Sequence, residues 1–168
     1  MRVAFGVSAL AAGMQQGGID GIGSVTRELL GRLQTSLDVE VLPYEFAHTA
    51  SGQIPGALAV GSFQRQALPS LVAPLSFPVM RAALCGRVDL VHATDHLIPR
   101  LNGTPVLATL MDAIPLSHPE WVAYRFRALM NSAWRRSAHW ADHVVTISEF
   151  SRREIACHFK LPESRISV

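Results

Sequence analysis

Short apolar runs alternate with helical patterns along most of the chain, and this alternation predicts the fold. Six segments have the length and apolar content of strands: Arg2–Ser8, Asp38–Tyr44, Val88–Ala93, Pro105–Leu110, Val144–Ile147 and a last strand that begins in Arg165–Val168. Strands that alternate with helices form a parallel sheet with right-handed crossovers. We therefore predict a single α/β, Rossmann-like domain over residues 1–168, with three layers, a mostly parallel twisted sheet and helices on both faces.

Helical spacing fills most of the segments between these strands. Apolar residues recur every three or four positions from Gly21 onward, so one helix begins there. Gln64–Gly86 is punctuated by prolines and predicts one or two helices. Trp121–Ala141 is the longest helical pattern, and it opens at His118-Pro119 because proline suits the first turn of a helix.

Two segments lack a regular period and predict loops. Ala9–Asp20 is rich in glycine and small residues, and Glu45–Phe63 is rich in Gly, Ser, Ala and Pro. The second of these loops follows the strand Asp38–Tyr44. That strand should lie near an edge of the sheet, because it contains Pro43 and two acidic residues.

Composition fits a globular protein of the cytoplasm. The chain is 49% hydrophobic and 17% charged, and its net charge of +2 with no Lys/Arg run argues against nucleic acid as a partner. The N-terminal apolar run is too short for a secretory signal. Ala67–Leu84 is the most apolar stretch, but three prolines and Arg81 interrupt it well short of a membrane span. Cys85 and Cys157 lack metal-ligand spacing and are predicted to be buried free thiols.

Polar clusters follow four of the predicted strands. Ligands of parallel sheets bind outside the carboxyl ends of the strands, so these clusters should share one edge of the sheet. The residues are Gly21, Gly23 and Ser24 in the glycine loop, Asp95 and His96, Met111 and Asp112, and Ser148 and Glu149. The sequence therefore predicts one site built from turns that are far apart along the chain.

The glycine loop fits a ligand site or a plain turn. Gly21 and Gly23 let a chain pass close to a ligand and then start a helix whose free amides face an anion. The spacing matches neither Gly-x-Gly-x-x-Gly directly after a strand nor a P-loop. A nicotinamide-cofactor or nucleoside-triphosphate site is therefore disfavoured.

The other candidates also have structural interpretations. Asp112 can contact a ligand or cap a turn at the strand end, whereas His92 has apolar neighbours and fits a packed histidine better than a ligand contact. Ser148 and Ser151 are predicted to be helix caps rather than catalytic groups. The chain has no Gly-x-Ser-x-Gly elbow of a serine hydrolase.

Three segments together resemble one known family. Met111–Trp121 resembles the His-Asp-Leu-Ile-Pro-Leu-x-x-Pro-Glu segment of the family 4 glycosyltransferases. Gly18–Leu30 is similar to that family's N-terminal glycine loop and first helix, and Asp142–Glu154 resembles its strand followed by Ser-x-Phe-Ser. The segments follow the family's order over nearly the whole chain.

This resemblance implies the acceptor-side, N-terminal half of a two-domain GT-B fold. The expected activity is retaining transfer of a hexose, with mannose as one candidate, from a nucleotide-sugar donor to a glycan or a lipid-linked acceptor. No metal or other cofactor is expected. The family continues past Arg165–Val168 into a C-terminal domain that holds the nucleotide, so this half should be inactive alone.

The resemblance also implies roles for individual residues. Asp112 would be the catalytic polar contact in the cleft, and the glycine loop would lie beside the sugar diphosphate. Asp95 and His96 would contact the acceptor. Met111 stands where the family usually has a histidine that contacts the donor sugar. Either that contact is dispensable, or activity is reduced, or a nearby histidine replaces it; the candidates are His92, His96 and His118.

Two other functions fit the same residues. A non-catalytic Rossmann-like binding or assembly module is favoured by Met111, and an ordinary dinucleotide-binding domain is a weaker alternative. Four arginines and two tryptophans lie within residues 125–140. They form either a solvated helix face or a face toward acidic lipid heads or a polyprenyl-linked acceptor, at the inner surface of the membrane.

Overall fold

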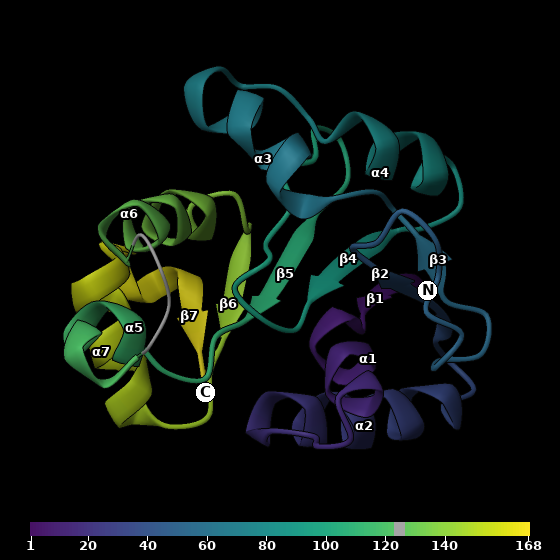
Figure 1. Cartoon of the computed structure of the whole chain (residues 1–168), viewed down its shortest axis with the longest axis horizontal. Coiled ribbons are helices and arrows are strands. Elements are labelled where there is room, and N and C mark those ends of the chain that lie inside the picture. The colour runs from purple at the N-terminus through teal and green to yellow at the C-terminus, as the bar shows by residue number, and fades with distance from the viewer. Residues whose placement is uncertain (123–126) are drawn as a thin grey trace.

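The computed structural model describes residues 1–122 and 127–168. Within them, one seven-stranded sheet has the order β3-β2-β1-β4-β5-β6-β7, and its six neighbouring pairs are all parallel (Figure 1). The strands are β1 (Arg2–Gly6), β2 (Glu40–Glu45), β3 (Leu58–Ala59), β4 (Leu90–Ala93), β5 (Val106–Thr109), β6 (His143–Val145) and β7 (Ile166–Ser167). The predicted Rossmann-like α/β class is confirmed.

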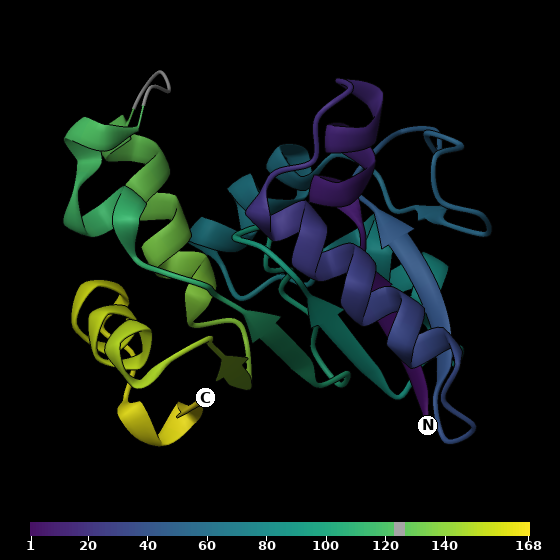
Figure 2. The same ribbon diagram turned by 90° about the horizontal axis from the view of Figure 1, so that it is seen from below.

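Helices cover both faces of this sheet. The longer helices are α1 (Ser8–Gln15), α2 (Gly21–Gln34), α3 (Phe63–Val72), α4 (Pro78–Leu84), α6 (Arg127–Ala138) and α7 (Glu149–Phe159). In Figure 1, α1 and α2 lie below the sheet and α3 and α4 above it, and the view from below in Figure 2 places α2 in front of the strands. The predicted three layers are therefore present.

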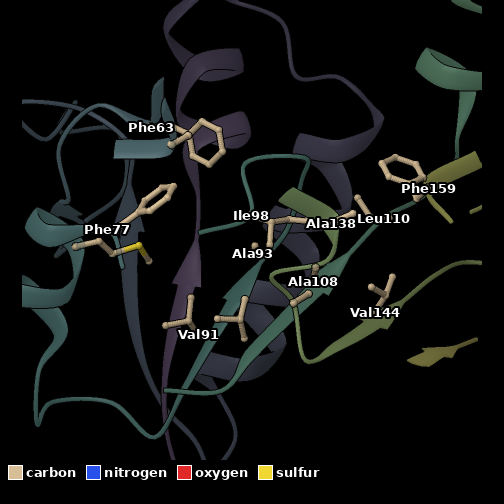
Figure 3. Close-up of a cluster of buried hydrophobic side chains, with 14 of the residues drawn as sticks. Phe63, Phe77, Val91, Ala93, Ile98, Ala108, Leu110, Ala138, Val144 and Phe159 are labelled. Carbon is tan, nitrogen blue, oxygen red and sulfur yellow. The ribbon is translucent and has the colours of Figure 1, made fainter. Parts of the chain in front are cut away.

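The two faces carry separate apolar cores because side chains alternate along each strand. Phe5 and Val7 of the first strand segment pack with Leu10 and Leu30 on the α1–α2 side. The opposite face holds the larger core, in which Phe63, Phe77 and Phe159 cover small strand residues such as Ala93 and Ala108; Figure 3 shows these rings beside the strands. Small side chains in the strands let the helices approach closely.

Side-chain caps begin the helices next to the sheet edge. The Oδ1 atom of Asp20 accepts a hydrogen bond of 2.7 Å from the Gly23 amide at the start of α2. The Ser148 hydroxyl accepts one of 3.1 Å from the Ser151 amide at the start of α7. These bonds satisfy amides that have no partner within the helix. The predicted cap at Ser148 is confirmed, whereas Ser151 lies within α7, so the prediction that it caps a helix was wrong.

Two predicted loops contain regular structure instead. The first, Ala9–Asp20, is mostly occupied by α1, whose alanines and Leu10 favour a helix and bury an apolar side against α2. The second contains β3, a two-residue strand that pairs with the end of β2. The prediction of β2 near the edge is confirmed, because only β3 lies outside it.

The predicted helix from His118 to Ala141 is wrong in its first part. The short helix α5 (Ile114–Ser117) ends at His118, and a single 3-10 turn, η1 (Pro119–Trp121), follows it. His118 has φ −131° and ψ 64°, outside the helical region, as expected for a residue that precedes proline. Residues 123–126 of the predicted helix lie outside the described residues. A second 3-10 turn, η2 (Glu163–Arg165), precedes β7.

Two further sequence predictions have clear outcomes in the described residues. None of the described helices has the length and apolar content needed to cross a bilayer. Cys85 and Cys157 are free thiols as predicted, but both are exposed, so the prediction that they are buried was wrong. Each lies in or next to a helix, on the side that faces away from the sheet core.

Replacement of Gly23 by alanine should destabilise the fold. A Cβ atom at this position would lie 2.7 Å from Cγ2 of Ile19 and 3.2 Å from Oδ1 of Asp20. The branched Ile19 side chain is stiff and packs in the α1–α2 core, so we expect a loss of about 1–3 kcal/mol in the free energy of unfolding. Urea unfolding monitored by circular dichroism measures this change.

The matched control is Gly21→Ala, two residues earlier in the same helix. No heavy atom lies within 4 Å of a Cβ placed there, so its effect should be neutral or slightly stabilising. Equal destabilisation by the two variants would contradict the packing role of Gly23.

Candidate functional site

The turns after β4 and β5 meet the first turn of α2 at the carboxyl edge of the sheet. Together they form a notch, lined by Ile22, Thr94, Asp95, His96, Thr109, Leu110, Met111 and Asp112. Its volume is about 10 Å³, roughly the space needed by one water molecule. The predicted convergence of the glycine-loop helix with the Asp95 and Asp112 turns is therefore present, whereas Ser148 and Glu149, also predicted at this site, do not line the notch. The notch alone does not enclose a ligand.

Hydrogen bonds between strands fix the edge at this notch. The Thr94 hydroxyl donates a bond of 2.9 Å to the carbonyl of Gly6, which joins the end of β4 to the end of β1. One strand further along the sheet, Nε2 of His92 lies 2.8 Å from Oγ1 of Thr109, which joins β4 to β5. The positions of the turns are thus set by buried contacts rather than by the turns alone.

Both aspartates shape their own turns. Oδ1 of Asp95 accepts a hydrogen bond of 2.8 Å from the amide of Leu97, and Oδ1 of Asp112 accepts one of 2.9 Å from the amide of Ile114. Asparagine and aspartate commonly form such turns after strands. The capping role anticipated for Asp112 is present, and each carboxylate remains at the notch.

Asp95 has an unusually basic carboxyl group. Burial raises its pKa from the ordinary 3.8 to about 6, the hydrogen bond from the Leu97 amide works in the opposite direction, and the negative charge of Asp20 adds to the rise. A carboxyl with a pKa near 6 can give or take a proton close to neutral pH. Asp95 is therefore the group of the notch best suited to proton exchange with a bound hydroxyl.

His96 connects the notch to the helices above it. Its ring stacks on Trp134 of α6, with ring centroids 5.0 Å apart, and on Phe159 of α7 at 6.1 Å. Burial lowers the pKa of His96, although the charge of Asp112 opposes the shift, so the ring is neutral at pH 7. Nδ1 is buried and has no hydrogen-bond partner among the described residues. One ring nitrogen of this notch-lining residue thus has no partner in the described part of the chain.

His92 is a packed histidine, as its apolar neighbours suggested. Its ring meets Phe5 edge-on with centroids 5.2 Å apart, in addition to the Thr109 hydrogen bond. Burial lowers the pKa of His92 to about 4, so it is neutral at pH 7. Its hydrogen bond holds the Thr109 side chain in place, and Thr109 lines the notch.

His118 makes its contacts elsewhere. Its Nδ1 atom lies 3.1 Å from Oε1 of Glu120, and its ring stacks on Trp121 with centroids 4.0 Å apart. Neither partner lines the notch. Of the three histidines considered as replacements at the Met111 position, His96 is the one that lines the notch with Met111.

The three glycine-loop candidates have different surroundings. Gly21 is exposed with open space around it, and Ser24 is exposed in the first turn of α2. Gly23 is buried against Ile19, so its lack of a side chain serves packing. Neither Gly21 nor Ser24 lines the notch, although both lie within two residues of Ile22, which does.

A second polar pocket at the same edge was missed from sequence. It has a volume of about 160 Å³ and lies at the end of β2, where Ser8, Gln15, Thr49 and Ser51 surround Glu45. Glu45 is only 4% exposed, and its Oε1 atom accepts a hydrogen bond from the Ser51 amide. The available signal was Glu45, an acidic residue that directly follows the apolar and aromatic positions Val41–Tyr44 of β2.

The variant Asp95→Asn should change how stability depends on pH. Between about pH 4 and pH 6 folded Asp95 keeps a proton that the unfolded chain has lost, so this group's contribution to stability falls as pH rises. Asparagine removes that effect and can still accept the Leu97 hydrogen bond. Relative to the parent protein, the free energy of unfolding of the variant should rise across this range and then stay constant.

Urea unfolding at several pH values measures this difference. Asp38→Asn, at an exposed position, is the matched control. A difference between Asp95→Asn and the parent that is independent of pH would contradict the raised pKa.

Comparison with known proteins identifies the family. The model of Glycosyltransferase Family 4 matches residues 19–168, a range that contains every residue lining the notch. No curated protein matches the chain. Because the matched range covers most of the sequence and includes the segments that resemble this family, the chain belongs to glycosyltransferase family 4.

Proposed function

We propose that this chain is the acceptor-side domain of a retaining transferase that moves a hexose from a nucleotide sugar to a glycan or a lipid-linked acceptor. Family membership supports the transferase class and implies a sugar donor and an acceptor. Mannose from a guanosine-diphosphate donor is our first candidate. We place the reaction in the cytoplasm, at the inner membrane face when the acceptor is lipid-linked.

The observation that carries this proposal is the notch at the carboxyl edge. Turns from three distant segments bring Ile22, Asp95, His96 and Asp112 together, yet the space between them is too small for a sugar. Such a surface fits one wall of a cleft. In our proposal a second domain of the same protein holds the nucleotide and forms the other wall, so the isolated domain turns over nothing.

The residues at the edge then have distinct roles. The Asp112 carboxylate accepts a hydrogen bond from a hydroxyl of the donor sugar. The unpartnered nitrogen of His96 donates or accepts another, which supplies the contact that Met111 cannot make. Asp95 accepts a hydrogen bond from the acceptor hydroxyl. The exposed first turn of α2, at Gly21 and Ser24, lies beside the diphosphate.

The roles of the remaining candidates are indirect. His92 positions Thr109, and His118 lies outside the notch and is dispensable for transfer in this proposal. The Glu45 pocket offers a carboxylate, hydroxyls and an amide, which suits further hydroxyl groups of a sugar-containing acceptor. The reaction as proposed requires no metal or other cofactor.

A non-catalytic binding or assembly module is the second candidate. Met111 favours it, because a thioether cannot donate a hydrogen bond to a donor sugar. The two proposals differ in whether the full-length protein transfers sugar at all.

The variant His96→Gln should lower sugar transfer by the full-length protein about 10- to 100-fold, because it removes a preorganised polar contact at the notch. Transfer of radiolabelled sugar from a panel of nucleotide sugars to a membrane-lipid and glycan extract measures the rate. His118→Gln is the matched control and should leave the rate unchanged. No transfer by the parent from any donor, with transfer restored by Met111→His, would support the non-catalytic module instead.

A further inference from the structure

An apolar groove separates α3 from α6 on the sheet face opposite α1 and α2. It has a volume of about 350 Å³, and apart from Gln64 and Ser137 its lining residues are apolar. Leu68 and Leu71 contribute from α3, and Met130, Trp134 and Trp140 from α6 and the segment after it. Figure 1 shows α3 and α6 as neighbouring helices, and the Phe63 ring labelled in Figure 3 forms part of the groove as well as of the core.

Apolar side chains at the mouth of this groove face solvent. Leu68 is 65% exposed and Leu129 is 69% exposed, and Val72 of the same helix as Leu68 is 87% exposed. A contiguous exposed apolar surface commonly marks a binding site. The volume lies in the range of small-molecule pockets, whereas a stable protein interface buries about 800 Å² on each partner. The groove therefore fits a slender apolar ligand.

The groove adjoins the polar notch. Leu97, which lines the groove, lies two residues after Asp95, which lines the notch. Trp134 lines the groove and stacks on His96, which lines the notch. One layer of stacked rings thus separates the apolar groove from the polar notch at the edge of the sheet.

The helices around the groove carry positive charge and no carboxylates. From Phe46 to Val88, a range that contains α3 and α4, the sequence has three arginines and no Asp or Glu. Helix α6 has three arginines, Arg127, Arg135 and Arg136, and again no acidic residue. Glu120 and Asp142 lie just outside α6 in the sequence, and Asp95 and Asp112 line the adjoining notch. A ligand with an anionic head outside the groove is therefore favoured electrostatically.

We propose that the groove between α3 and α6 binds one hydrocarbon chain of an anionic, phosphate-bearing lipid, and that this lipid is the acceptor. The inference rests on the proposed transferase function for the acceptor role, and it selects the lipid-linked acceptor over a free glycan. The chain lies between the helices, the phosphate lies toward the arginines that α3 and α6 carry, and the polar end reaches the notch past His96.

Calorimetric titration of the full-length protein with dodecyl phosphate, below its micelle concentration and without any nucleotide sugar, tests the binding directly. We expect saturable binding at one site, weaker binding of a neutral dodecyl glycoside, and no binding of inorganic phosphate. Ala133→Phe fills the groove and should weaken dodecyl phosphate binding about tenfold or more, since several methylene groups lose their buried surface. Ser132→Phe, the exposed neighbour outside the groove, is the matched control.

Leu129→Gln gives a second test that does not depend on filling the interior. This side chain is exposed at the mouth, so the variant should fold and still weaken binding. Binding unchanged in both variants overturns the proposal, as does equal affinity for inorganic phosphate. Binding only to anionic vesicles shows a membrane-docking face instead, and a lipid-independent dimer broken by Ala133→Phe shows a second copy as the occupant.

The titrations measure lipid binding and not sugar transfer, so they test the groove separately from the proposed activity. Dodecyl phosphate binding without sugar transfer would leave the groove assignment standing and contradict the transferase. Transfer to a soluble glycan, with no dodecyl phosphate binding, would support the transferase and contradict the groove assignment.

Discussion

The structure depends on the parallel pairing of its strands. Because all six neighbouring pairs run in the same direction, every strand ends at the same edge, and the turns that follow meet there whatever their distance along the chain. Two hydrogen bonds hold the adjacent ends of β1, β4 and β5 together: one joins Thr94 to Gly6, and the other joins His92 to Thr109. The notch results from this geometry, and membership of glycosyltransferase family 4 relates it to sugar transfer.

Burial sets the protonation of the groups at this edge. Asp95 and His96 are both shifted toward their neutral forms, the acid by a raised pKa and the base by a lowered one. At pH 7 the His96 ring is neutral, whereas Asp95, with a pKa of about 6, is mostly ionised and exchanges its proton readily; both groups can form hydrogen bonds with hydroxyls. The edge therefore offers groups that can exchange hydrogen bonds with hydroxyls.

The polar notch and the apolar groove lie on two sides of a single pair of stacked rings. His96 faces the notch and Trp134 faces the groove, and the two rings stack. An amphiphilic acceptor would use both surfaces at once. This arrangement joins helices on one face of the sheet to turns on its edge, so it depends on the packing of α6 as much as on the strands.

Much of the fold could be predicted from local patterns. The apolar runs located β1, β2, β4, β5 and β6, the helical spacing of apolar residues located the start of α2, and the serine cap located that of α7. Glycines concealed α1, although its alanines favour a helix, and β3 is too short to leave a pattern. The break at His118 follows from Pro119, which was given too little weight against the continuous helical spacing.

The site was predictable in location but not in detail. Parallel topology alone places Asp95 and Asp112 at one edge. Which histidine lies beside Met111 depends on side-chain packing, because His92 points to Thr109 and Phe5 while His96 lies against Trp134. The groove joins residues from two helices that lie far apart in the sequence, and no local pattern relates Leu68 to Trp134. The buried Glu45 likewise depends on the later Ser51 turn.

Hydrogen–deuterium exchange of the full-length protein with and without its nucleotide sugar measures the central claim most directly. If the carboxyl edge is one wall of the transfer site, amides in residues 21–24, 94–98 and 110–114 become protected on binding. Protection confined to other surfaces of this domain, with the donor demonstrably bound and these three segments unchanged, would show that the converging turns serve the fold and not the reaction.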